Sequence, residues 1–192
     1  IKQVVDVRDG EIMFGLNMVV YKSKTIFVGD TSVHEYPTSE QMAEMAISTA
    51  RVVRLFGFDP KVAFVSHSTF GQPLTSRTKH IRRAVDILKE RKVDFEFDGD
   101  MQPDVALDPE YEELYPFSKI VGKANILIMP GQHSAAISYK MMKTLGDTKV
   151  IGPLLIGLGL PIEIAPLRSS TSELINLASI AAYSADVIDY EK

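Results

Sequence analysis

The sequence predicts an α/β fold in which a mostly parallel sheet carries helices on both faces. Along the 192 residues, short apolar runs alternate with stretches of helical periodicity, and strands separated by amphipathic helices build this arrangement. A hairpin near the amino terminus, with strands Met13 to Tyr21 and Thr25 to Val28 around the turn Lys22-Ser23-Lys24, adds an antiparallel portion. No repeat or linker-like segment divides the chain, so we expect a single domain over residues 1–192.

Two helices in the first half are indicated by caps and by apolar spacing. Thr38 opens the first helix, and Gln41 three residues later completes a capping box. The second helix has one apolar face opposite a basic face, which is typical of a helix that covers a sheet. Its apolar residues are Ile81, Ala84, Val85 and Leu88.

Further segments are short and apolar, as the buried strands of a parallel sheet are. They are Lys61 to Ser66, Val93 to Phe97, Ile126 to Met129, Val150 to Leu155 and Pro161 to Ile164.

Two more helices are expected in the second half of the chain. The first runs from about His133 to Leu145 and ends at Gly146. Ser170 and Glu173 form the capping box of the second, in which Leu174 to Ala185 is apolar on nearly every face. Such a helix is expected to be deeply buried or to lie at an interface.

The composition argues against several classes of function. A net charge of −4 is unlike that of proteins that bind the phosphate backbone of nucleic acids. The absence of cysteine excludes a disulfide scaffold, a thiolate nucleophile and a zinc–cysteine site, and it fits the cytoplasm, where we expect the protein to be. The longest strongly apolar run, Pro153 to Pro161, is too short to span a bilayer, so neither nucleic acid nor a membrane is an expected partner.

Three polar segments that follow strands are candidates for binding a phosphate-like anion. The loop after the strand that ends at Ser66 offers hydroxyls and backbone amides, although a polar exit from a strand has the same composition. The helix that begins near His133 offers its dipole and free amides, although simple capping by Ser134 explains that sequence equally well. An arginine in a hydroxyl-rich loop supplies a charge that binds anions. The candidate ligand-binding residues are Ser66, Ser68, Thr69, Gln132, His133, Ser134, Arg168, Ser169 and Ser170.

Other motif-like features carry weaker signals. Asp98-Gly99-Asp100 follows a predicted strand and is interpreted as solvated loop charge, because Gln102 and Pro103 break the pattern of a calcium-binding loop. The four histidines have no metal-binding spacing, so no metal site is expected. Gly157-Leu158-Gly159 lacks the third glycine of a dinucleotide fingerprint.

Four segments of the chain together resemble one known family. They are Gly29-Asp30-Thr31, Tyr36-Pro37-Thr38-Ser39-Glu40-Gln41, Ser66-His67-Ser68-Thr69-Phe70-Gly71 and Asp98-Gly99-Asp100-Met101. These segments resemble the phosphotransacetylase family, whose fold is isocitrate-dehydrogenase-like, and the resemblance covers essentially the whole chain. Their residues are most similar to those of the carboxy-terminal phosphotransacetylase-like domain of large NADP-dependent malic enzymes.

The resemblance implies transfer of an acetyl group between coenzyme A and phosphate, but two positions depart from the family pattern. Arg168 is present, whereas Leu167 stands in place of the family's serine and Leu174 in place of its aspartate. Leucine can neither donate a hydrogen bond to an oxyanion nor take the proton of a thiol. We therefore expect no catalytic residue in this domain.

Three hypotheses follow: a regulatory ligand-binding and assembly domain, a working phosphate acetyltransferase with a rearranged site, or a purely structural dimerisation module. The first is favoured. It implies acetyl-CoA or CoA and phosphate-like anions as ligands, and a homodimer or higher homo-oligomer. Because the chain starts at Ile1 and the family's domain is longer at its amino end, we expect it to be the C-terminal part of that domain in a longer chain. No cofactor is expected in this domain; NADP and a divalent metal are expected only in the absent malic-enzyme part.

Overall fold

The computed structural model describes residue 1 and residues 4–190, the last four of them without their side chains. One sheet contains the strands β1 (Phe14–Tyr21), β2 (Lys24–Gly29), β3 (Lys61–Val65), β4 (Glu96–Met101), β5 (Ile126–Ile128), β6 (Thr148–Ile156) and β7 (Ile162–Glu163). The helices are α1 (Ser39–Leu55), α2 (Ser76–Arg91), α3 (Pro103–Leu107), α4 (Gln132–Leu145) and α5 (Thr171–Tyr190).

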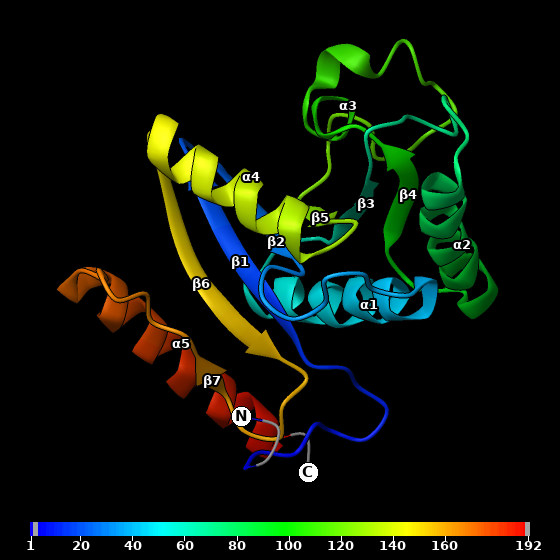
Figure 1. Cartoon of the computed structure of the whole chain (residues 1–192). Coiled ribbons are helices and arrows are strands. Elements are labelled where there is room, and N and C mark those ends of the chain that lie inside the picture. Colours follow the sequence, from blue (N-terminus) through cyan, green and yellow to red (C-terminus); the bar gives the residue numbers. More distant parts are fainter. Residues whose placement is uncertain (2–3, 191–192) are drawn as a thin grey trace.

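The strand order in the sheet is β4-β3-β5-β2-β1-β6-β7 (Figure 1). The strands β2, β5, β3 and β4 pair in parallel. β1 pairs antiparallel with both β2 and β6, and β7 pairs antiparallel with β6, so β1 and β7 run against the others. The predicted α/β fold and the antiparallel hairpin near the amino terminus are confirmed. The antiparallel part also takes in strands from the end of the chain.

Helices cover both faces of the sheet, as the sequence predicts (Figure 1). α1, α2 and α5 lie over one face, where Phe27, Met42 and Leu88 belong to one buried core. α3, α4 and the segment 120–124 lie over the other face, where Leu127 and Ala135 belong to a second core. The two faces therefore carry separate sets of packed side chains.

The local signals for the helix starts are confirmed. The Thr38 side chain accepts a hydrogen bond from Gln41 N–H, and the Gln41 side-chain oxygen accepts one from Thr38 N–H. Ser170 and Glu173 make the same exchange at the start of α5. The backbone N–H of Ser170 and then the ammonium of Lys143 lower the pKa of Glu173 to about 2.

A strand is predicted over Val93 to Phe97. The structure places it later in the chain, as β4 from Glu96 to Met101. The interpretation of Asp100 as solvated loop charge is wrong: its side chain is fully buried at the end of β4. A buried carboxylate is tolerated where hydrogen-bond donors meet it, and Ser68 Oγ and Gly71 N–H both donate to Asp100.

The helix α5 is not deeply buried in this chain. Among its side chains described through residue 186, Leu177 is buried, whereas Leu174, Ile175 and Tyr183 are all about half exposed. The alternative of a deeply buried helix is therefore wrong here, and the alternative of an interface stays a prediction. Within the described part of the chain, no helix combines the length and apolar character needed to cross a membrane.

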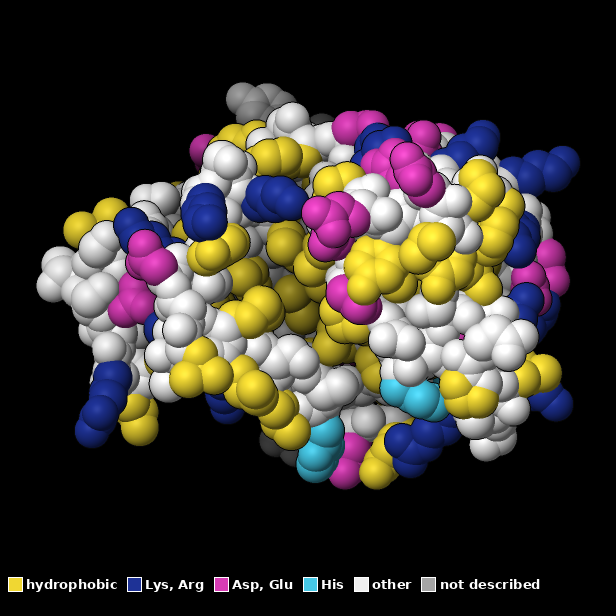
Figure 2. Space-filling view, turned by 90° about the horizontal axis from the view of Figure 1, so that it is seen from above, with side chains coloured by type: hydrophobic (Ala, Val, Ile, Leu, Met, Phe, Trp, Pro, Cys, Tyr) yellow, Lys and Arg dark blue, Asp and Glu magenta, His cyan; other side chains and the backbone are white. Residues whose placement is uncertain are grey.

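A second apolar feature is a hollow in the surface. Seen from above in Figure 2, the molecule is hollowed between two lobes, and hydrophobic side chains line the floor. A cavity of about 560 Å³ lies between the β1–β2 hairpin, α3 and α4, with Ile26, Leu107 and Met142 in its wall and Lys22 and Lys24 at the hairpin tip.

Candidate functional site

At the carboxyl ends of β3 and β5, the connections of the sheet diverge to opposite faces. β3 leads to α2, which packs on the same face as α1, whereas β5 leads to α4 on the other face. The two strands are parallel neighbours, with Phe64 opposite Ile128. Open α/β sheets bind ligands in the crevice outside the carboxyl ends of the strands at such a switch point. This edge of the sheet is therefore the candidate site.

The hydroxyls predicted on the β3 side are buried and bonded within the chain. Ser68 Oγ donates to Asp100, and Ser66 Oγ lies 3.2 Å from Ser68 Oγ. Thr69 Oγ1 accepts from Gln102 N–H at 3.2 Å. All three hydroxyl-bearing residues are less than a tenth exposed. These contacts join the loop after β3 to the end of β4 and hold the loop in one shape.

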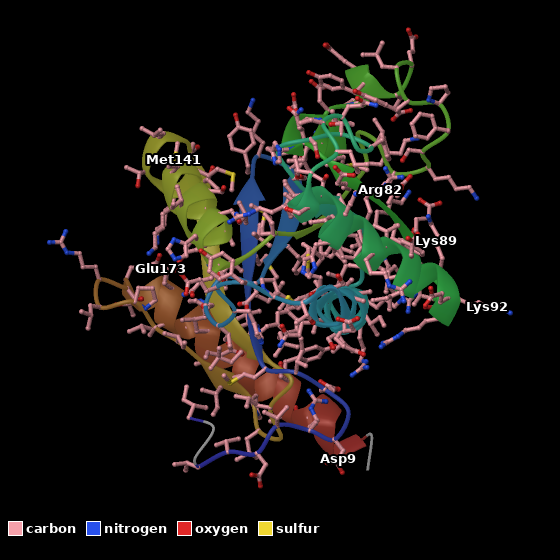
Figure 3. All side chains as sticks on the ribbon, turned by 45° about the vertical axis from the view of Figure 1, so that its right-hand side comes forward. Asp9, Arg82, Lys89, Lys92, Met141 and Glu173 are labelled. Atoms are coloured by element: carbon pink, nitrogen blue, oxygen red, sulfur yellow. The ribbon has the colours of Figure 1, made fainter. Side chains whose placement is uncertain are left out.

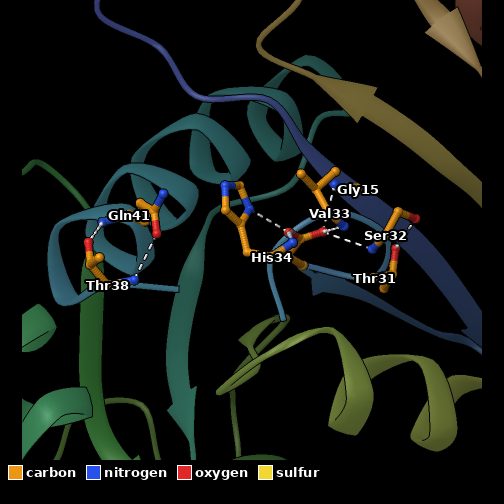
Figure 4. A network of polar contacts seen from close by, with 8 residues as sticks. Gly15, Thr31, Ser32, Val33, His34, Thr38 and Gln41 are labelled. Atoms are coloured by element: carbon orange, nitrogen blue, oxygen red, sulfur yellow. Dashed lines mark hydrogen bonds and ion pairs between the residues drawn. The ribbon is translucent and has the colours of Figure 1, made fainter. Parts of the chain in front are cut away.

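A second buried carboxylate fixes the loop after β2 (Figure 4). One oxygen of Asp30 accepts from the backbone N–H groups of Gly15, Ser32 and Val33, at 2.8, 2.9 and 3.1 Å. The other accepts from His34 N–H at 2.7 Å and lies 2.7 Å from His34 Nδ1. Because the Asp30 side chain is fully buried, these contacts together replace its lost hydration and hold the loop in one shape.

This loop in turn holds the start of α4. Gln132 N–H donates to the His34 carbonyl at 2.9 Å, and His133 Nε2 lies 3.1 Å from Glu35 Oε1. Ser134 Oγ donates to the backbone carbonyl of the residue that caps α4, at 2.8 Å. The predicted segments after β3 and at the start of α4 thus lie at the ends of adjacent strands, as expected.

A pocket of about 370 Å³ opens beside the switch point. Its walls come from the loop after β2, the first turns of α2, and Pro130 after β5. Tyr36 is 72% exposed, and the guanidinium of Arg77 lies 5.8 Å from the centroid of its ring. His80 Nε2 lies 2.8 Å from the Pro37 carbonyl. Because a carbonyl only accepts, this nitrogen carries a proton that it donates.

The third predicted segment lies in the loop between β7 and α5. Arg168 is exposed, and Leu167 beside it is fully exposed. Ser169 Oγ is buried without a hydrogen-bond partner among the described residues, while Ser170 caps α5. Leu174 is 46% exposed one turn later. The positions at which the resemblance predicts the chemistry, Leu167, Arg168 and Leu174, therefore lie at the surface of this chain.

This loop is separated from the switch point by the length of α4. Glu173, at the start of α5, pairs with Lys143 near the end of α4 at 2.9 Å. Lys143 lies about 16 Å along the helix from Gln132, at 1.5 Å of rise per residue. Figure 3 shows Glu173 and Arg82 of α2 on opposite sides of the molecule. Arg168 therefore does not join the other predicted residues in one crevice of this chain.

Sequence reasoning missed several residues of the site. Asp30 and Asp100 each follow a glycine at the end of a strand, and this repeated Gly-Asp pair was an available signal. The signal for Tyr36 and Arg77 was weaker. It was that Arg77 is a cation in the first turn of a helix that has no acidic residue in that turn. Within the described residues, no group of three or more His, Asp or Glu is placed to hold a metal ion.

Comparisons with known proteins identify the family and the fold. The family model described as "Phosphate acetyl/butaryl transferase" matches residues 1–182. The chain is 44% identical to an NADP-dependent malic enzyme of Rhizobium meliloti over 185 residues, which is 96% of this chain and 24% of that protein. It is 33% identical to a phosphate acetyltransferase of Clostridium acetobutylicum over 83% of this chain and 49% of that one.

A solved structure is similar over nearly the whole chain. A phosphotransacetylase from Streptococcus pyogenes matches with a TM-score of 0.89 and 31% identity, over 95% of this chain and 57% of that one. The chain spans about a quarter of the length of the malic enzyme that it matches. On the family match, the sequence identity and the shared sheet, the chain belongs to the phosphate acetyl/butaryl transferase family.

Proposed function

We propose that this chain is an acetyl-CoA-responsive regulatory and oligomerising domain of an NADP-dependent malic enzyme. In this proposal, malate is oxidised and decarboxylated by another part of a longer protein, which binds NADP and a divalent metal. The domain binds acetyl-CoA and transfers no acetyl group. The support is the similarity to about a quarter of the length of a malic enzyme, together with the leucines at positions 167 and 174, where the resemblance leads us to expect serine and aspartate.

The observation that carries the proposal is the environment of Leu167 and Leu174. Transfer of an acetyl group from a thioester to phosphate needs donors for the oxyanion and a base for the thiol. Neither leucine supplies them, and both side chains are exposed. Glu173 is no substitute for the base, because it is already bonded to Ser170 and Lys143. Loss of a positioned base commonly costs roughly two to four orders of magnitude in rate.

The first experiment measures transfer of the acetyl group from acetyl-CoA to phosphate, in the longest protein that contains this chain. The expected result is turnover far below the ordinary enzyme range of about ten per second. The double variant Leu167→Ser, Leu174→Asp restores the family's residues beside Arg168 and serves as a matched comparison. Turnover of tens per second by the unchanged protein would overturn the proposal.

The second experiment measures malate oxidation with and without acetyl-CoA. Inhibition requires that acetyl-CoA bind one conformation of the whole assembly more tightly than another. A coupling of about 1–3 kcal/mol, or about 5- to 150-fold, is typical. Arg168→Ala is expected to weaken inhibition and to leave turnover without acetyl-CoA intact, because a guanidinium binds phosphate or thioester oxygens. Equal inhibition of both proteins would show that Arg168 is not the contact.

The alternative is an active phosphate acetyltransferase that moves acetyl between CoA and phosphate. It is favoured by one observation, the 33% identity to a protein named phosphate acetyltransferase. The first experiment decides between the two functions.

A further inference from the structure

The apolar hollow beside the β1–β2 hairpin lies apart from both regions considered so far. Its cavity of about 560 Å³ is bounded by β1, β2 and the ends of α3 and α4. It shares no lining residue with the pocket beside the switch point, and none of its lining residues belongs to the loop before α5. Cavities of about 300–1,000 Å³ with a mostly apolar lining are the usual sites of small molecules.

The floor of the hollow is apolar and fixed. Val19 of β1 is buried in the core on this face of the sheet, and Ile26 and Leu107 pack against that core. On the side of α4, Met142 is 37% exposed, and methionine is the side chain that adapts most readily to the shape of an apolar ligand. An alkyl chain would therefore meet a preformed floor and one adaptable wall.

The rim of the hollow carries charge of one sign. Lys22 and Lys24 lie at the hairpin tip and line the cavity, and none of the described residues that line it is acidic. Lys22 Nζ lies 5.1 Å from the centroid of the Tyr21 ring, which also lines the cavity. This contact places the ammonium at the edge of the apolar floor. An apolar floor below a cationic edge is complementary to a ligand with an apolar chain and an anionic end.

The backbone sets Lys22 apart from the other lysines of the surface. Tyr21 pairs with Lys24 in the hairpin, so the loop consists of Lys22 and Ser23. Lys22 has a φ of 52°, in the left-handed region that disfavours side chains with a Cβ. Two-residue hairpin loops favour glycine or asparagine at such a position. The turn itself does not explain a lysine there, and an outlier of this kind points to a function.

We propose that the hollow binds a fatty acid of medium chain length, with the alkyl chain on the apolar floor and the carboxylate at the ammonium groups of Lys22 and Lys24. Burial of the chain supplies most of the affinity, and the charge-assisted contacts orient the carboxylate. A second copy of this chain is the competing occupant. A twofold contact centred on the hollow would bring the hairpin lysines of both copies together, with no acidic lining residue to balance them. The inference goes beyond the proposed function, and neither depends on the other.

The test is calorimetric titration of the 192-residue chain with decanoate, octanoate and octanol, each below the concentration at which it aggregates. A buried methylene contributes up to about fourfold in affinity, so octanoate is expected to bind about tenfold more weakly than decanoate. Octanol has the chain of octanoate without its charge, and it separates the contribution of the rim from that of the floor.

The floor is tested with a charge placed in it. Met142→Glu puts a carboxylate at the wall of the hollow and is expected to weaken decanoate by about tenfold or more. Met141→Glu is the matched control, because Met141 precedes it on α4, is 54% exposed and does not line the cavity (Figure 3). The control is expected to change the affinity by less than about threefold, as a solvated charge does.

The rim is tested by removing its charge. The double variant Lys22→Ala, Lys24→Ala is expected to weaken octanoate by about fivefold and to leave octanol unchanged. Lys92→Ala is the control, because Lys92 has the same charge and the same φ of 52° but lies at the end of α2, away from the hollow (Figure 3). Its affinity for octanoate should equal that of the unchanged chain.

The opposite results overturn the proposal. Absence of decanoate binding at millimolar concentration does so, and so does equal affinity for octanoate and decanoate. Equal weakening by Met142→Glu and Met141→Glu would place the ligand outside the hollow. Equal loss of octanoate and octanol in the double lysine variant would refute the contact with the carboxylate. A binding stoichiometry that falls as the protein concentration rises would show that a second copy covers the hollow instead.

Discussion

The switch-point crevice and the loop before α5 were both expected to bind an anion, and they are built in opposite ways. At the crevice, the buried carboxylates of Asp30 and Asp100 gather donors from several segments. In the loop, Arg168 and Leu167 extend from the surface, and Ser169 Oγ has no partner among the described residues. The polar contacts of the crevice are made within this chain, whereas the loop exposes the side chains of Arg168 and Leu167 to the surroundings.

The difference teaches that a retained family residue and a preformed site are separate things. The resemblance predicts Arg168 as an anion contact, but no hydrogen bond or ion pair among the described residues holds its exposed side chain. Tyr36 and Arg77 are not among the predicted ligand-binding residues, yet they lie in a pocket whose walls are fixed by buried polar contacts. Fully satisfied polar networks make a region rigid, so the crevice is the part in which binding requires the least reorganisation.

The largest expected effect is on stability, and it separates the two regions directly. Asp30→Ala is expected to lower the free energy of unfolding by about 3 kcal/mol or more, because it leaves several buried donors without an acceptor. Arg168→Ala is expected to change it by less than about 0.5 kcal/mol, as for most exposed positions. Urea denaturation of both variants measures the contrast. Similar losses in the two would mean that the loop is as firmly held as the crevice.

The next effect concerns self-association through α5. Leu174 and Ile175 are 46% and 58% exposed, and an apolar surface of this kind marks an interface. The unchanged chain is expected to sediment as a dimer or larger at micromolar concentration. The double variant Leu174→Ser, Ile175→Ser is expected to raise the dissociation constant at least about tenfold, or about 1.4 kcal/mol.

Leu114→Ser is the matched control, because that leucine is also exposed, at 67%, but lies in the segment between α3 and β5. A monomer in the unchanged chain contradicts the role of α5, and so does equal weakening by both variants.

The last effect is a pH dependence in the antiparallel region. Burial raises the pKa of Glu163 to about 8, from an ordinary value of 4.5, and its Oε2 has no hydrogen-bond partner among the described residues. The folded chain therefore keeps the proton between these values while the unfolded chain releases it, so stability falls as pH rises from about 4.5 to about 8. Thermal unfolding of Glu163→Gln across this range should show a shallower fall. An identical slope in both proteins would contradict the assignment.

Most of the fold could be predicted because its signals are local. The hairpin, the capping boxes at Thr38 and Ser170, and the helix that ends at Gly146 all depend on neighbouring residues. The position of β4 could not be predicted so well, because the buried Asp100 at its end is explained by donors far away in sequence, Ser68 Oγ and Gly71 N–H.

The site was harder to predict than the fold. Its pocket depends on β5 lying between β3 and β2, an order that brings Pro130 beside Tyr36 and Arg77. Local patterns do not contain strand order. The resemblance pointed to Arg168 as an anion contact, but it could not show that in this chain Arg168 lies at the other end of α4 from the crevice.

The helix α4 connects the two regions, because each of its ends is bonded to one of them. Its first residue is bonded to the loop after β2, and Lys143 near its end is bonded to Glu173 at the start of α5. A helix of this length, about 21 Å, converts a tilt of about 5° at the crevice into a shift of about 2 Å at the far end. A ligand that reorients the first turn of α4 would therefore move the start of α5 and its exposed apolar side chains, the surface at which self-association is predicted.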